Sequence, residues 1–345
     1  MRVREEWASR AIVHALGTAA VVLAITACTG AQSALDVRGP GAERIATLWW
    51  LLLGVAVVVY AAVMALLLGA VLRSRRDPRE PADETDDIRR RRARRLIGGM
   101  IAVTAVILTA VFLVTLRTQV ALHAHAAQEL TIEVTGRRWW WEIRYRGSSP
   151  GDQVITANEI HIPTGQRVRI ELTSADVIHS FWVPNLQGKT DLVPGRTLVT
   201  WLEADVPGIS RGQCAEYCGI QHTNMAFLVV AEAPAEFARW LAEQRQAASP
   251  PADTMSQRGQ SIFVSSGCVS CHAVSGTPAV DLLGPNLTHF ASRRTIAAGT
   301  LTNTRENLTA WLDDPQRSKP GNLMPRVPLT PAALDAVVHY LESLR

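Results

Sequence analysis

Residues 214–225 read Cys-Ala-Glu-Tyr-Cys-Gly-Ile-Gln-His-Thr-Asn-Met, a segment that brings thiol, imidazole and thioether groups close together in the chain. These soft ligands suit copper, which must be held in two oxidation states. Residues 268–272 read Cys-Val-Ser-Cys-His, the attachment pattern of a c-type haem. The fifth cysteine, Cys28, stands alone, so no pair remains for a disulfide. Two redox metals on one chain indicate electron transfer.

The chain has 345 residues, which is enough for two folded domains and a membrane anchor. Its formal charge of +4 is modest, and nearly all of its basic residues are arginines, many of them in one short run. No glycine-rich phosphate loop is present. The composition therefore argues against a nucleic-acid partner.

The N-terminus has the pattern of a signal segment. Basic residues precede an apolar stretch at 11–24, which is too short to cross a bilayer comfortably. Ile25-Thr26-Ala27-Cys28 then resembles the bacterial lipoprotein box. We expect a lipoprotein-type signal peptide at 1–27, a lipid anchor on Cys28 and an outer linker at 28–45. The alternative is an uncleaved anchor with an incidental buried cysteine.

Two apolar segments are long enough to cross a membrane, at 46–72 and 96–116. The segment between them, 73–95, is packed with arginine, and by the positive-inside rule it is cytoplasmic. Everything after the second span then lies on the outer face of the cell membrane. That placement agrees with a covalent haem and an exported copper site.

From residue 129 the pattern changes to short strands with turn residues between them. We expect strands at 130–134, 167–172, 198–202 and 226–230, forming an antiparallel sandwich or barrel over 117–237. A helical tail and a Pro- and Ala-rich linker, 238–254, follow. Residues 255–345 form the haem domain, with helices at both ends and a long loop between them.

A count of ligands favours a dinuclear copper site. Cys214 and Cys218 can each bridge two copper ions, which leaves one imidazole and one weak ligand for each metal. His179 and His222 supply the imidazoles. The weak ligands are the Met225 thioether and a backbone carbonyl, that of Glu216. A structural zinc on the two cysteines and two histidines is the alternative, but it leaves the weak ligands unexplained.

This cluster, together with segments 176–184 and 189–196, resembles subunit II of haem-copper cytochrome c oxidases, and the likeness covers the helical hairpin and the whole sandwich. The resemblance implies a cupredoxin fold that holds the dinuclear copper-A centre. It also implies that the Glu216 carboxylate reaches a magnesium or manganese ion shared with subunit I. Trp139 matches an exposed tryptophan through which electrons enter in that family. Trp140 and Trp141 are expected to be structural.

The haem domain resembles a class I cytochrome c. Cys268 and Cys271 would carry the thioether links, and His272 would ligate one face of the iron. Met324, within Gly-Asn-Leu-Met-Pro at 321–325, is the expected ligand of the other face. In segment 284–287, the carbonyl of Pro285 is expected to accept a hydrogen bond from His272. The lone histidines, His161 among them, are expected on the surface or satisfied in the core.

The whole chain thus resembles an oxidase subunit II with a C-terminal cytochrome c, within a proton-translocating oxidoreductase. We expect electrons to pass from cytochrome c or another donor to haem c, then to copper-A, then to subunit I. Subunits I and III and the lipid bilayer are the expected partners. A copper-A nitric oxide reductase subunit and a free-standing membrane electron carrier remain alternatives, whereas the two cysteines argue against a quinol oxidase.

One departure from the family pattern concerns protons. Many members open the second span with a glutamate, a Trp-Thr pair and a proline, and the glutamate helps to admit protons to subunit I. Here residues 94–100 read Arg-Arg-Leu-Ile-Gly-Gly-Met and contain none of these. Asp86 or Asp87 could act instead, but a solvated charged loop is the simpler interpretation.

Overall fold

The computed structural model describes residues 30–76, 86–123, 130–147, 149 and 152–345. The expected signal peptide and Cys28 lie outside these residues. The chain divides into two compact units, one made of residues 43–124 and the other of residues 1–42 and 125–345.

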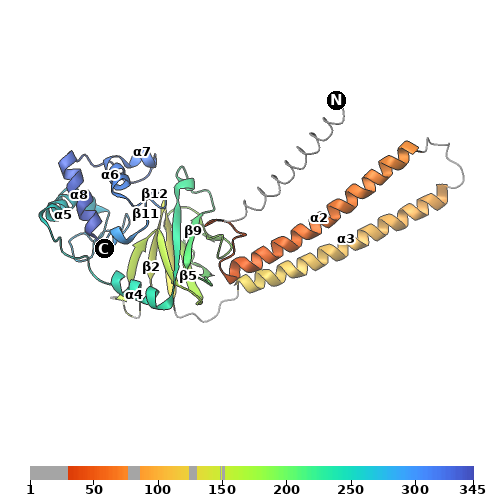
Figure 1. Cartoon of the computed structure of the whole chain (residues 1–345), viewed down its shortest axis with the longest axis horizontal. Coiled ribbons are helices and arrows are strands. Elements are labelled where there is room, and N and C mark those ends of the chain that lie inside the picture. Colours follow the sequence, from red (N-terminus) through yellow and green to blue (C-terminus); the bar gives the residue numbers. More distant parts are fainter. Residues whose placement is uncertain (1–29, 77–85, 124–129, 148, 150–151) are drawn as a thin grey trace, which may run out of the picture. The chain divides into compact units, whose positions relative to one another are not determined.

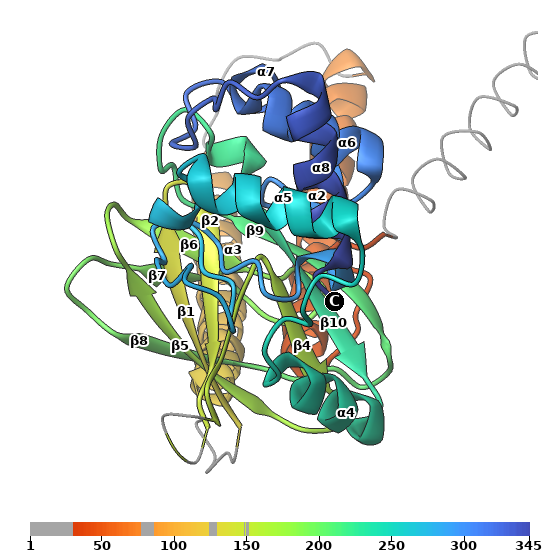
Figure 2. The ribbon, with the colours of Figure 1, turned by 90° about the vertical axis from the view of Figure 1, so that its left-hand side faces the viewer.

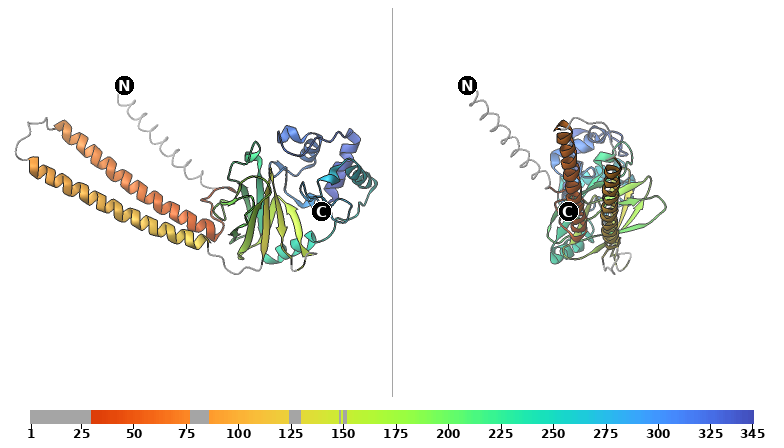
Figure 3. Two further views of the ribbon diagram at one scale, coloured as in Figure 1. Left: turned by 180° about the vertical axis from the view of Figure 1, so that it is seen from behind. Right: turned by 90° about the vertical axis from the view of Figure 1, so that its right-hand side faces the viewer.

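The smaller unit is a hairpin of two long helices, α2 (Pro40–Arg76) and α3 (Asp86–His123) (Figures 1 and 3). Both are long and apolar enough to cross a membrane, over Pro40–Arg73 and Arg90–Leu122. Large apolar side chains along them are exposed, as expected of helices that face lipid or other chains. The expectation of two apolar helices is confirmed, and the expected spans 46–72 and 96–116 lie inside them.

The larger unit contains a β-sandwich of two five-stranded sheets, ordered β3-β2-β1-β5-β8 and β4-β10-β9-β6-β7. Most neighbours are antiparallel, but β1 pairs with β5 and β4 pairs with β10 in parallel. The strands are β1 (Thr131–Arg137), β2 (Trp140–Tyr145), β3 (Val154–Ala157), β4 (Glu159–Pro163), β5 (Val168–Ser174), β6 (His179–Trp182), β7 (Thr190–Leu192), β8 (Leu198–Leu202), β9 (Gly208–Cys214) and β10 (Ala226–Glu232).

The all-β fold of this region is confirmed, and the four expected strands correspond to β1, β5, β8 and β10. Strand β1 alternates between buried and half-buried side chains, which is the pattern that made it visible in the sequence. Trp141 is fully buried between the sheets, with ring centroids 6.0 Å from Phe181 and 5.2 Å from Phe227. This aromatic cluster lies directly beneath the ends of β6 and β9 that carry the candidate copper ligands.

The haem domain is mostly helical, and its helices group beyond one end of the sandwich (Figure 2). The expected terminal helices are confirmed as α5 and α8, which cross where Gly259 meets Ala336, and a Cβ on Gly259 would lie 2.0 Å from the Ala336 carbonyl oxygen. The expected long loop between them is wrong in part, because it contains further short elements. The elements are α5 (Thr254–Ser265), η3 (Cys268–Ser270), η4 (Phe290–Ser292), β11 (Thr295–Ile296), β12 (Leu301–Thr302), α6 (Arg305–Asp313), α7 (Pro315–Ser318) and α8 (Pro331–Ser343).

The segments that flank the sandwich are ordered against it. The amide of Asn185 donates to the carbonyls of Gly30, Ser33 and Asp36, so this part of the expected outer linker packs on the sandwich. After β10, helix α4 (Pro234–Gln244) begins with proline in its first turn, where the missing N–H costs nothing. Its Trp240 packs on Tyr145 of β2.

Candidate copper and haem sites

Adjacent strands bring the candidate copper ligands together from distant parts of the chain. His179 opens β6 and Cys214 closes β9, and these strands pair with Phe181 opposite Cys214. The following loop carries Cys218 and ends in η2 (His222–Asn224). The chain then returns into β10, where the amide of Cys214 donates to the carbonyl of Met225.

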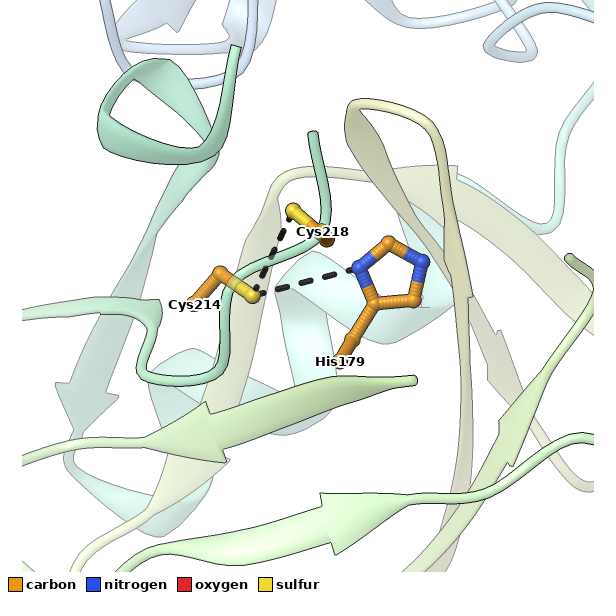
Figure 4. Close-up of side chains that lie close together, drawn as sticks. All are labelled: His179, Cys214 and Cys218. Carbon is orange, nitrogen blue, oxygen red and sulfur yellow. Dashed lines mark hydrogen bonds between the residues drawn. The ribbon is translucent and has the colours of Figure 1, made fainter. Parts of the chain in front are cut away.

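Three of the expected ligands form a buried cluster at the centre of the site (Figure 4). The Sγ atoms of Cys214 and Cys218 lie 3.8 Å apart, and Nδ1 of His179 lies 3.9 Å from the Cys214 sulfur. A metal–thiolate bond is about 2.3 Å, so one ion can touch both sulfurs only if they lie within about 4.6 Å of each other. The cysteine pair meets this condition and is therefore able to bridge metal ions.

The remaining expected ligands surround the same two sulfurs. Nδ1 of His222 lies 3.6 Å from the Cys218 sulfur, and the thioether of Met225, which is fully buried, lies 3.8 Å from it. The backbone carbonyl of Glu216 lies 3.2 Å from the Cys214 sulfur. Each sulfur thus has one imidazole and one weak donor beside it. This set fits two copper ions, whereas a four-ligand zinc site needs neither the thioether nor the carbonyl.

The two thiols influence each other's ionisation. Hydrogen bonding from Cys218 lowers the pKa of the Cys214 thiol to about 3, and His179 adds to this. The same contact with Cys214, together with burial, raises the pKa of Cys218. The metal-free pair therefore shares one proton, and metal binding at both sulfurs must release it.

A carboxylate that the sequence interpretation passed over orients His179. Oδ1 of Asp176 lies 2.8 Å from Nε2 of His179, while the second oxygen accepts the Arg138 amide at 2.7 Å. Burial raises the pKa of Asp176, but hydrogen bonds from His179, Val177 and Arg138 outweigh it and lower the pKa. The charged carboxylate thus holds the proton on Nε2 and leaves Nδ1 free for a metal. An acid three residues before a ligand histidine was the available signal.

Trp139 is not exposed as expected, since only 8% of it is accessible. Its indole N–H donates to the carbonyl of Cys218 at 3.0 Å, so the ring lies against the copper loop. Its own carbonyl accepts a hydrogen bond from Lys319 of the haem domain. The expectation of an exposed ring is wrong because the ring packs against the copper loop, where a Cβ on Gly219 would lie 2.9 Å from its Cζ2 atom. Trp139 lies at the domain boundary instead.

Lys319 is the second residue that the sequence interpretation missed. Only 3% of it is exposed, and its ammonium group donates to the carbonyls of Asn224, Trp139 and Ala297 at 2.8, 3.1 and 3.1 Å. Burial lowers the pKa of Lys319 to about 7, and negative charge on the nearby Cys218, when that thiol ionises, opposes this effect. Lys319 is thus an electrostatic neighbour of the copper cluster.

The expected haem-attachment residues lie close together in the chain, at the start of the haem domain. Cys268 opens η3, and Cys271 follows this short helix directly. As expected, His272 is oriented by Pro285, with Nδ1 2.7 Å from the proline carbonyl oxygen. Burial lowers the pKa of His272, which favours the neutral imidazole that a metal requires. With Nδ1–H bonded to the carbonyl, Nε2 is available to ligate iron.

Gly284 allows this arrangement. A Cβ at this position would lie 2.6 Å from Cε1 of His272, so only glycine lets the backbone approach the imidazole ring. Farther along the chain, Met324 lies between α7 and α8. Its amide donates to Asn322 at 2.8 Å, and its carbonyl accepts from Gln316 at 3.1 Å. The backbone of the expected second ligand is therefore fixed.

His161 is a satisfied core histidine, as expected. Its two ring nitrogens lie 3.2 Å from Glu159 and 3.1 Å from Glu232, and its ring stacks on Trp240 with centroids 4.0 Å apart. Burial lowers the pKa of His161, but the hydrogen bonds to the two glutamates outweigh burial and raise it.

Comparison with known proteins gives two family matches. The family described as "Cytochrome C oxidase subunit II, periplasmic domain" matches residues 149–232, and the family described as "Cytochrome c" matches residues 256–345. A cytochrome c oxidase subunit 2 of Alkalihalophilus pseudofirmus is 34% identical over 333 residues, which cover 94% of this chain and 95% of the relative. A cytochrome c oxidase subunit 2 of Bacillus sp. strain PS3 is 36% identical over 228 residues, or 63% of this chain and 62% of the relative.

Among solved structures, a match is found to the crystal structure of the periplasmic domain of subunit II of cytochrome oxidase from Bradyrhizobium japonicum. The two sequences are 30% identical, and the match covers 35% of this chain and 96% of the other, with a TM-score of 0.33.

Proposed function

Because the chain belongs to the cytochrome c oxidase subunit 2 family, we propose that it is the electron-input subunit of a haem-copper terminal oxidase. Electrons pass from an external donor through covalent haem c to a dinuclear copper centre, and then to the oxygen-reducing centre of subunit I. The observation that carries the proposal is the buried cluster of two sulfurs, each with an imidazole and a weak donor beside it. The haem-attachment pattern in the same chain supports the first step.

At the copper site, Cys214 and Cys218 are the proposed bridging ligands, because one ion can reach both sulfurs. His179 and His222 are the proposed terminal ligands through Nδ1, the nitrogen of each ring that lies near a sulfur. The thioether of Met225 and the carbonyl of Glu216 complete the set. A buried, pre-shaped ligand cage keeps its geometry in both oxidation states, which suits electron transfer.

In the haem domain, the proposed thioether links are at Cys268 and Cys271, and His272 and Met324 are the proposed axial ligands. The groups held at these two sites supply one-electron redox chemistry when bound. The protein contributes orientation, through the bond between His272 and Pro285, and a thioether that favours a high reduction potential.

We propose Trp139 as the residue at which electrons reach the copper site. Two contacts support this role. Its indole N–H donates to the carbonyl of Cys218, a bridging ligand, and its carbonyl binds Lys319 of the haem domain. Trp139 thus contacts the copper loop through its ring and the haem domain through its backbone carbonyl.

The membrane arrangement is proposed on the same basis. Helices α2 and α3 anchor the chain in the cell membrane beside subunits I and III, with both metal domains on the outer face, and a lipid on Cys28 adds a second anchor. The Glu216 carboxylate is proposed to bind magnesium or manganese at the boundary with subunit I. Glu216→Gln should lower the manganese content of the complex purified from cells grown with manganese, whereas Glu236→Gln, at an exposed position of α4, should not.

The proposed function is tested by purifying the complex that forms around the tagged chain in mild detergent and supplying it with reduced cytochrome c. Oxygen uptake by a complex containing a large haem-bearing partner is the expected result, with about two copper ions and one haem per chain beyond those of the partner. Nitric oxide turnover without oxygen turnover would assign the chain to a reductase instead. A solitary chain that is inert to both gases would leave only an electron carrier.

A further inference from the structure

The haem domain meets the copper domain through two short segments, 293–300 and 319–321. In the first, the carbonyl of Ala298 accepts the amide of Ala226, the first residue of β10, at 3.0 Å. In the second, the carbonyl of Pro320 accepts the side-chain amide of Gln221 at 2.7 Å. Both partners on the copper domain lie in or beside the ligand loop. This part of the contact is therefore made with the copper site, while Arg293 and Arg294 of the first segment bind Thr156 of β3 and Glu159 of β4.

Lys319 is unusual within this chain. The sequence contains only two lysines, Lys189 and Lys319, against a large number of arginines. Lys189 is exposed, whereas Lys319 is buried and donates to three backbone carbonyls. An ammonium group has three donor protons and no acceptor, so three carbonyls satisfy it fully, while the planar fork of arginine would not fit them. The site is built for a lysine.

The haem-domain side of this site adopts a strained backbone. Ala297 and Ala298 both have left-handed conformations, with φ of 53° and 57°. Residues with a Cβ rarely adopt this conformation because it is unfavourable, and it persists only where the surroundings enforce it. Here it turns the Ala297 carbonyl toward Lys319 and the Ala298 carbonyl toward Ala226. The strain is thus located where the two domains are joined.

Of the two copper-domain carbonyls that bind Lys319, that of Asn224 lies within the ligand loop and that of Trp139 lies in a segment packed against the loop. Asn224 is one residue before the ligand Met225, and Trp139 donates its indole N–H to the carbonyl of Cys218. A single side chain of the haem domain therefore touches both segments that enclose the copper ligands.

We propose that Lys319 is a positioning residue that holds the tethered haem domain on the copper loop, in the arrangement from which electrons are transferred. The inference rests on the proposed function and adds the residue that fixes the geometry of its first internal step. In that step one electron leaves the haem iron, which is oxidised, and reduces the copper pair by the same amount, with no bond made or broken.

The test compares the wild-type complex with Lys319→Met, which keeps the length of the side chain but donates no hydrogen bond. Hydrogen–deuterium exchange of the Ala226 backbone amide, measured by mass spectrometry, reports docking, because the carbonyl that accepts its hydrogen bond belongs to Ala298 of the haem domain. Flash-induced electron transfer from haem to copper reports the function. The loss of charge-assisted hydrogen bonds is expected to make exchange about tenfold faster and transfer about tenfold slower. Lys189→Met is the matched control and should change neither.

Folding of the haem domain is checked by haem absorbance. If Lys319→Met loses that absorbance, the variant Ile220→Glu is used instead to test docking, because Ile220 is exposed on the copper domain and contacts Gly321 of the haem domain. Ile220→Glu should weaken docking and leave the absorbance spectra of both metal sites intact. Wild-type exchange and transfer rates in a folded Lys319→Met would overturn the proposal. Absence of transfer in the wild type would instead refute the proposed function, and Ala226 exchange would still decide whether Lys319 joins the domains.

Discussion

Replacing Asp176 by asparagine is expected to weaken copper binding by 10- to 100-fold. The asparagine side chain would keep the size of the original but lose the negative charge that holds the proton on Nε2 of His179. Partners of this kind typically contribute about 10- to 100-fold to metal affinity. That range corresponds to about 1.4–2.8 kcal/mol. The upper half is favoured here, because His179 is fully buried and the Asp176 carboxylate lies 2.8 Å from its Nε2 atom.

The change is measured by titrating the purified complex with a copper chelator while its copper absorbance is followed. Asp205→Asn is the matched control, because Asp205 is an exposed aspartate of the same domain, and its titration should match that of the wild type. Haem absorbance should be unchanged in both variants. A shift of less than about threefold for Asp176→Asn would show that the carboxylate does not support His179, and the geometric argument would then be refuted.

Three further changes test the haem domain and the core. Gly259→Ala should lower the unfolding temperature of the haem domain by several degrees in calorimetry, because the new Cβ would lie 2.0 Å from the Ala336 carbonyl oxygen where α5 and α8 cross. An unchanged unfolding temperature would contradict the close contact between these helices. Met324→Ala should leave the haem attached but lower its reduction potential sharply in a redox titration, whereas Met255→Ala should leave the potential unchanged. If the Met324→Ala variant and the wild type have the same potential, Met324 is not the axial ligand. Because the pKa of His161 is raised in the folded protein, its stabilising contribution is complete below about pH 6.5 and is lost as the pH rises through the folded pKa. In urea unfolding, the stability advantage of the wild type over His161→Gln should therefore shrink with rising pH. An advantage that grows with pH would contradict this prediction.

Much of the copper site was visible in the sequence because its chemistry is concentrated in one loop. Most of the expected donors lie between Cys214 and Met225, so their spacing alone shows that they can meet. His179 had to be placed by the ligand count, and the pairing of β6 with β9 then brings it to Cys214. Asp176 was overlooked because a carboxylate that binds no metal leaves no trace in such a count.

The missed features depend on contacts between residues that are far apart in the chain. Strand β9 reads Gly-Ile-Ser-Arg-Gly-Gln-Cys, which has little apolar alternation, and it is a strand because it lies between β10 and β6. Gly212 in this strand lets the ring of Phe227 lie against the backbone. Lys319 is 180 residues from Trp139, and nothing local marks it as a partner. Composition offered one clue, the scarcity of lysine.

A docked haem domain changes what an external donor must recognise. When the copper domain meets a soluble donor directly, Trp139 has to be accessible, and a weak, charge-steered surface is sufficient. In this chain Trp139 is covered and its carbonyl is bound by a buried ammonium group. The Lys319 contact can be buried because a tethered haem domain need not dissociate in each turnover, and the tether keeps the local concentration of this domain high. Under the proposed function, the external donor is therefore recognised by the haem domain, and the boundary with the copper domain serves to place the two sites precisely.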